Sequence, residues 1–106
     1  GGRAGVPDVK ALTFFFKGFI SMFFPEPLGP DDLTVREVIV KVVNEILVRL
    51  EESRNRLSGD DLEVIGFSLR RVFFIMKAYA AEKKRFTVSQ WLEQLSSVAK
   101  ESGITI

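Results

Sequence analysis

The sequence predicts an all-α fold, a compact antiparallel four-helix bundle. Apolar residues recur three and four positions apart in four separate stretches, which is the spacing of one buried helix face. The turns between the last three stretches are short, and short turns join antiparallel neighbours. A length of 106 residues suits one domain. We expect a disordered or cloning-derived segment at 1–6, a single domain at 7–106, and helices at 8–24, 34–57, 60–85 and 88–102.

The predicted helix 8–24 differs from the others because it is apolar around most of its circumference. Pro7 and Asp8 suit its first turn, and Pro25 ends it. Its few polar residues lie three or four positions apart and make one narrow stripe, formed by Lys10, Thr13 or Lys17, and Ser21. We therefore expect this helix to be buried on most sides.

Capping signals predict where the other three helices begin. Each start pairs a residue that can accept a hydrogen bond from a free amide with an acid or amide side chain that reaches back: Thr34 with Glu37, Asp60 with Glu63, and Thr87 with Gln90. Gly59 is expected to end helix 34–57 in a left-handed conformation. Trp91 lies on the apolar side of helix 88–102, so we expect it in the core.

The residue types that the chain lacks exclude several classes of function. It has no Cys, which excludes disulfides, thiolate catalysis, zinc fingers and iron–sulfur ligation. It has no His, which is the usual general base near neutral pH and the commonest metal ligand. The net charge is +1, so any attraction to nucleic acid or membrane must come from a local cluster. The absence of Cys and the ladders of Lys, Glu and Arg also fit a thermophilic source.

Paired carboxylates and serines are the remaining catalytic candidates. The doublets Asp31-Asp32 and Asp60-Asp61 could hold Mg²⁺, but both lie near predicted helix starts, where acids cap free amides. No Ser lies in a Gly-x-Ser-x-Gly elbow, and no Gly-rich phosphate loop is present. A Ser–Lys pair assembled in space stays open. We expect a protein that is not an enzyme, with no catalytic residue, cofactor or metal.

The first candidate site is the set of phenylalanines on helix 8–24. They point in more directions than three neighbouring helices can cover, because consecutive residues are about 100° apart. Exposed apolar surface usually marks a protein interface, so we expect a homo-oligomer or a protein partner here. Two alternatives are a central, fully enveloped helix and a membrane-surface helix with Lys10 and Lys17 toward the headgroups. The expected interface residues are Phe14, Phe15, Phe16, Phe19, Phe23 and Phe24.

The second candidate site is a basic cluster near the end of helix 60–85. Arg70, Lys77 and Lys84 are seven residues apart, so they lie along one line of the helix that could follow a phosphate backbone. Tyr79 lies nearby and could stack on a base. The alternative is a structural role, because cations at a helix C-terminus complement its dipole. The expected nucleic-acid contacts are Arg70, Arg71, Lys77, Lys83, Lys84 and Arg85.

The sequence therefore favours a non-enzymatic interaction or assembly module that uses helix 8–24 for self-association or a protein partner. The alternative is a small nucleic-acid-binding subunit that uses the basic line of helix 60–85. No apolar stretch reaches the roughly 20 residues that span a bilayer, so we expect a soluble protein without a transmembrane segment. The lack of Cys leaves the compartment undetermined, and we expect an intracellular one. No pattern indicates a small-molecule substrate.

Overall fold

The computed structural model describes residues 8–53, 56 and 58–103 and confirms the predicted all-α four-helix fold. The predicted segment 1–6 lies outside the described residues. The helices are α1 (Val9–Phe23), α2 (Pro30–Ser53), α3 (Gly59–Glu82) and α4 (Val88–Glu101), with a short 3-10 helix, η1 (Lys83–Arg85), between α3 and α4. No helix within these ranges is both long enough and apolar enough to cross a membrane.

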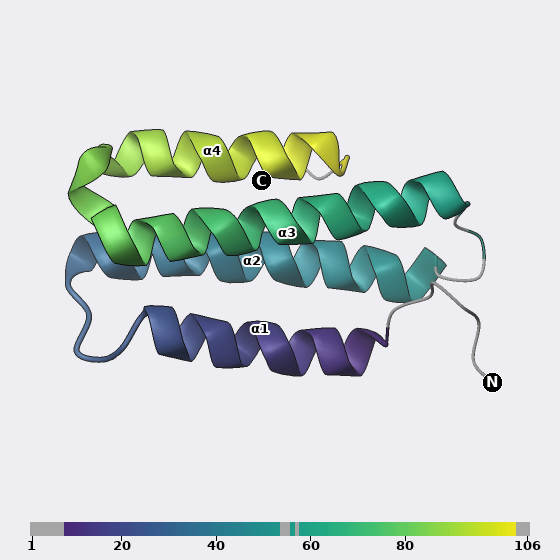
Figure 1. The fold of residues 1–106 in the computed structure, drawn as a ribbon, viewed down its shortest axis with the longest axis horizontal. Coiled ribbons are helices and arrows are strands. Elements are labelled where there is room, and N and C mark those ends of the chain that lie inside the picture. The colour runs from purple at the N-terminus through teal and green to yellow at the C-terminus, as the bar shows by residue number, and fades with distance from the viewer. Residues whose placement is uncertain (1–7, 54–55, 57, 104–106) are drawn as a thin grey trace.

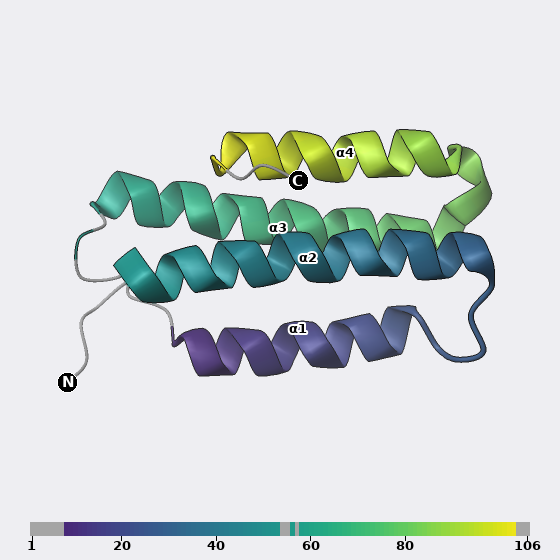
Figure 2. The ribbon, with the colours of Figure 1, turned by 180° about the vertical axis from the view of Figure 1, so that it is seen from behind.

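The helices run along the 43 Å long axis of a body whose other extents are 24 and 18 Å. Consecutive helices run in opposite directions, as Figure 1 shows. The central pair, α2 and α3, packs together, and each of its helices also contacts both α1 and α4. The two remaining helices flank this pair on opposite sides (Figure 1 and Figure 2). Because α1 is a flanking helix, the alternative that it is central and fully enveloped is wrong.

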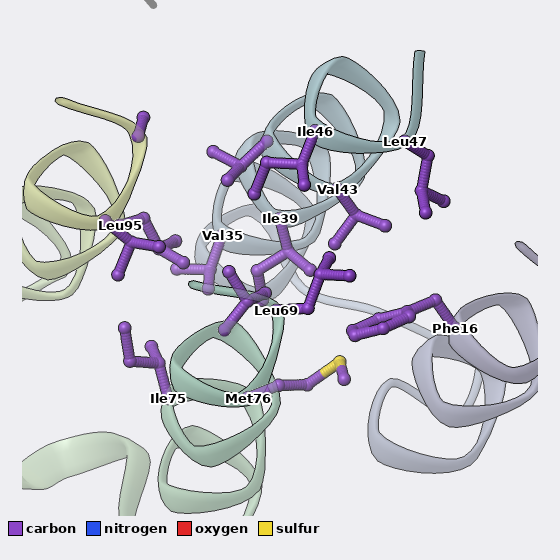
Figure 3. Close-up of a cluster of buried hydrophobic side chains, with 14 of the residues drawn as sticks. Phe16, Val35, Ile39, Val43, Ile46, Leu47, Leu69, Ile75, Met76 and Leu95 are labelled. Atoms are coloured by element: carbon purple, nitrogen blue, oxygen red, sulfur yellow. The ribbon is translucent and has the colours of Figure 1, made fainter. Parts of the chain in front are cut away.

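The core lies where the flanking helices meet the central pair. In Figure 3, Phe16 of α1 and Leu95 of α4 approach the side chains of α2 and α3 from opposite sides. The central pair supplies most of the fully buried aliphatic side chains: Val35, Ile39, Val42, Ile46, Leu50, Val72 and Met76. Trp91 is buried as predicted, and its Nε1–H donates to the Lys83 carbonyl at 2.9 Å.

The start of α2 differs from the prediction. The helix begins at Pro30 and not at Thr34, whose Oγ1 instead donates to the Pro30 carbonyl one turn earlier, at 3.0 Å. Pro suits the first position of a helix because its missing N–H would have no partner there. Asp31 and Asp32 then occupy the first turn, where the helix dipole favours acids. A residue inside a helix cannot form the predicted capping box with Glu37.

The predicted boundaries of α3 are wrong at both ends by a few residues. Its N-cap is Ser58, which forms a capping box with Asp61, so Gly59 begins α3 and does not end α2 in a left-handed conformation. At the other end the backbone leaves the α conformation at Glu82, where φ is −143° and ψ is 50°, and η1 follows. The Lys83 carbonyl is then available to accept from Trp91.

The ends of α1 and α4 agree closely with the prediction. Asp8 caps α1 by accepting from the Lys10 amide at 3.0 Å. Thr87 and Gln90 form the predicted capping box of α4. Beyond α4, Gly103 takes the left-handed conformation with φ +73°, so among the described residues this is where a helix end uses the freedom of Gly.

Candidate interaction surfaces

The six phenylalanines of the predicted interface occupy three environments. From the core outward, they are Phe16 and Phe24, which are buried, Phe19 and Phe23, which are half-buried, and Phe14 and Phe15, which are exposed. The half-buried pair packs on Phe73 of α3, whose ring centroid lies 4.9 Å from that of Phe19 and 5.9 Å from that of Phe23. These contacts cover the side of α1 that faces α3. Phe14 and Phe15 present the ring surface that a partner can reach most easily.

The outward face of α1 consists of Phe14, Phe15, Gly18 and Met22. The exposed fractions of its three large side chains are 75% for Phe14, 55% for Phe15 and 60% for Met22. A Cβ added at Gly18 would meet no atom within 4 Å, so the helix surface there is open. The prediction did not include Met22, although its place seven residues after Phe15 puts both on the same side of a helix. None of these four residues is charged, and the exposed Lys10 lies one turn before Phe14 on the same side.

A groove of about 520 Å³ lies on the other side of α1, between α1 and α2. Its polar rim comes from both helices: Thr13, Lys17, Ser21, Arg36, Glu37 and Asn44. Its apolar lining includes Phe16 and Val43 from the core. Lys17 therefore borders the groove with α2 and is not part of the outward face.

Three of the six predicted nucleic-acid contacts are already engaged within the chain. Arg71 forms an ion pair with Glu101 of α4. Lys83 pairs with Asp32 of α2 at 3.1 Å. The third, Arg85, pairs with Glu82 at 3.2 Å and stands over the Phe86 ring at 5.5 Å. These contacts fit the structural alternative for this part of the cluster.

The other three cations, Arg70, Lys77 and Lys84, are exposed and pair with no carboxylate in the described part of the chain. They are the residues whose seven-residue spacing predicted one basic line. Arg70 and Lys77 both lie within α3 and keep that line. Lys84 lies in η1, where the change of helix type means that spacing alone no longer places it on the same line.

Two phenylalanines that the prediction did not select lie beside this line. Phe67 and Phe74 are each 56% exposed. Together with the two cations they form the aromatic–basic row of α3, which is Phe67, Arg70, Phe74 and Lys77. The intervals of three, four and three residues place all four on one helix face. The spacing of these residues is visible in the sequence, but Phe67 and Phe74 also continue the apolar pattern of α3, so their exposure is known only from the structure.

Tyr79, predicted to be available for stacking on a base, is buried. Its ring stacks on Phe24 and meets Trp91 edge-on, with centroids 5.5 and 5.3 Å away. Its hydroxyl donates to Oδ1 of Asp32 at 2.6 Å, and Lys83 Nζ donates to the same carboxylate. The prediction for Tyr79 is therefore wrong, because the ring joins the core to a polar contact between α2 and α3.

The polar contact around Asp32 changes the pKa of two groups. The hydrogen bond from Tyr79 lowers the pKa of the Asp32 carboxyl below its usual value of 3.8, against the effect of burial, and Lys83 lowers it further. Burial, followed by the bond to Asp32, raises the pKa of the Tyr79 hydroxyl. Both shifts follow from an arrangement that holds Asp32 ionised and Tyr79 protonated. Asp32 is thus a link between helices, in addition to an acid at a helix start.

Acidic residues do not gather into a metal site in the described ranges, where no three of His, Cys, Asp and Glu lie close enough to hold an ion. Comparisons with protein-family models, curated proteins and solved structures give no match for this chain. A function therefore has to be inferred from the chain's own residues. Two features of those residues differ from an ordinary bundle surface: the outward face of α1 and the aromatic–basic row of α3.

Proposed function

We propose that this chain is a non-enzymatic assembly module that buries the outward face of α1 against protein, with a second copy of the chain as the first candidate. The observation that supports this proposal is the exposure of Phe14, Phe15 and Met22 on one side of a helix that already packs against two others. The buried side of α1 faces α2 and α3, so the outward face has no cover within the described chain.

The size of the outward face indicates a weak contact. With roughly 200 Å² for each large side chain, the exposed fractions of Phe14, Phe15 and Met22 leave on the order of 400 Å² of apolar surface. A stable complex buries about 800 Å² on each partner. Burial of the outward face alone therefore supports self-association that depends on concentration, and not a permanent dimer.

A second copy suits this surface for two reasons. None of the four residues of this face is charged, so two copies that meet on these residues place no like charges in direct contact. The nearest cation on this side, the exposed Lys10, lies one turn before Phe14. Gly18 leaves an open position beside Phe14 and Phe15, so a ring from one copy can lie over Gly18 of the other. Such a two-fold contact is self-complementary, with α1 crossing α1 near Gly18.

Sedimentation velocity between about 10 μM and about 1 mM tests the proposal. We expect the weight-average sedimentation coefficient of the wild-type chain to rise with concentration. The double variant Phe14→Ser with Phe15→Ser should stay monomeric, because these side chains support the contact and not the core. A matched control, Val48→Ser with Val64→Ser, removes exposed apolar side chains from α2 and α3, where they are 51% and 49% exposed, and should associate like wild type.

Two results would count against the proposal. A wild-type chain that stays monomeric over the whole concentration range would show that no second copy covers the face. A monomer that sediments with vesicles of phosphatidylserine and phosphatidylcholine, and loses this binding in the double variant, would assign the same side chains to a membrane surface.

A further inference from the structure

We propose that the aromatic–basic row of α3 binds single-stranded nucleic acid, with bases stacked on Phe67 and Phe74 and phosphates held by Arg70 and Lys77. This site is separate from the outward face of α1 and does not depend on self-association. It gives the basic line of α3 a defined ligand and adds two residues that stack on bases.

The order of residues along the row matches the chemistry of a single strand. Phe67 comes before Arg70, and Phe74 before Lys77, so each ring has a cation almost one turn further along the helix. A single strand likewise presents bases and phosphates in alternation, and bases stack on aromatic rings whatever their sequence. The two rings are about 10 Å apart along the helix axis, so a strand of about four nucleotides reaches both.

The charge around the row favours an anionic ligand. From Val64 to Ala81, α3 contains no Asp or Glu. Arg70 and Lys77 have no carboxylate partner among the described residues, whereas Arg71 is neutralised by Glu101. A second copy of the same row would bring cations against cations and is disfavoured.

Acids define one end of the surface and so give the site a direction. Asp60 and Glu63 border Phe67 at a hollow of about 450 Å³ between α3 and α4. A phosphate is repelled at that end. The strand therefore extends from Phe67 toward Lys77, away from these acids.

Fluorescence anisotropy with a labelled oligothymidylate of about 12 nucleotides tests the site in low salt, at about 20 mM. We expect the logarithm of the association constant to fall linearly with the logarithm of the salt concentration. The slope should be near −1.4, because each of the two phosphate contacts on a single strand contributes about −0.7. Phe74→Ala and Phe67→Ala should each weaken binding by at least about five-fold, as expected for one lost stacking contact. Both rings are half exposed, so these variants should keep their fold.

Charge variants and competing ligands complete the test. Arg70→Gln with Lys77→Gln should abolish binding, whereas Lys41→Gln with Lys100→Gln removes the same charge from exposed positions on α2 and α4 and should change affinity less than about two-fold. A duplex of the same length should bind more weakly because its bases are not free to stack. The proposal is overturned by no anisotropy change in low salt, by equal binding of duplex that the phenylalanine variants do not alter, or by binding of anionic vesicles alone.

Discussion

The two flanking helices, α1 and α4, pack against the same central pair but are buried to different extents. Four α4 residues are buried, including Trp91 and Leu95, whereas within α1 only Phe16 is buried. The largest side chain of α4 is covered, while α1 exposes Phe14, Phe15 and Met22. The difference shows that α4 completes the core, whereas α1 leaves apolar side chains exposed.

Polar contacts reinforce the same contrast. Helix α4 is held by the Trp91 bond to Lys83 and by the Arg71 ion pair with Glu101. Its C-terminal end is closed by Arg49, whose Nη1 donates to the carbonyls of Ser102 and Gly103 at 3.0 and 2.9 Å. No hydrogen bond or ion pair joins a described side chain of α1 to another helix, so packing alone holds α1 in place.

Substitution of the buried Trp91 of α4 and of the most exposed aromatic residue of α1, Phe14, tests this difference and should give the largest effect. Trp91→Ala should lower the free energy of unfolding by about 3 to 5 kcal/mol, because it leaves a cavity and an unpaired Lys83 carbonyl. Phe14→Ala should change it by less than about 0.5 kcal/mol. Urea denaturation followed by circular dichroism measures both. Equal losses of stability in the two variants would contradict the difference between the buried helix α4 and the partly exposed helix α1.

Removal of the Tyr79 hydroxyl should give the next largest loss of stability. Its ring lies between Phe24, just beyond α1, and Trp91 of α4, so the side chain supports both flanks. Tyr79→Phe keeps these ring contacts and removes the hydrogen bond to the Asp32 carboxylate, and we expect a loss of about 1.5 kcal/mol. Urea denaturation at pH 7 measures this loss. An unchanged free energy of unfolding would mean that the hydrogen bond from Tyr79 to Asp32 contributes nothing to stability.

The Asp32 carboxylate makes part of the stability depend on pH. Its pKa is lowered in the folded chain, so its contribution is complete above the unfolded value near 4 and is lost as the pH falls through the folded value. The free energy of unfolding of the wild-type chain should therefore exceed that of Asp32→Asn at pH 7. This difference in stability, the gap between the two chains, should narrow below about pH 4. Denaturation at a series of pH values measures the gap, and a gap that stays constant would exclude this role for Asp32.

Replacement of a glycine by alanine should give the smallest changes in stability, and the two positions tested, one within α1 and one just beyond α4, should change it in opposite directions. Gly103→Ala should cost about 1 kcal/mol, because φ is +73° and the new Cβ would lie 2.9 Å from Arg49 Nη1. Gly18→Ala should stabilise the fold by about 0.5 to 1 kcal/mol, because the position is helical and open. Thermal denaturation measures both shifts.

The fold followed from the sequence because apolar spacing and capping residues act over short distances. The capping box of Thr87 with Gln90 and the burial of Trp91 were both predicted correctly. The start of α2 was not, because Thr34 and Pro30 are both acceptable near a helix start and the prediction chose the later residue. Such competition between nearby signals shifts boundaries without changing the fold.

The candidate surfaces were predictable only in part, because exposure depends on how the helices are arranged. The surplus of Phe on α1 was visible in the sequence, but which rings face the core depends on which sides of α1 the central pair covers. The same holds for the basic cluster, since Arg71 and Lys83 find their partners, Glu101 and Asp32, far along the chain. The burial of Tyr79 likewise depends on residues far along the chain, including its partner Asp32, and so could not be predicted from the sequence.

The most direct measurement of the central claim uses the absence of Cys from the chain. Gly18→Cys places a single thiol on the outward face of α1, and Val48→Cys places one on the exposed surface of α2. If two copies meet near Gly18, the Cα atoms there approach within the roughly 7 Å that a disulfide requires. Mild oxidation should then convert Gly18→Cys to a covalent dimer on a non-reducing gel much faster than Val48→Cys. Equal rates for the two variants would contradict the claim that α1 is the face on which the chain assembles.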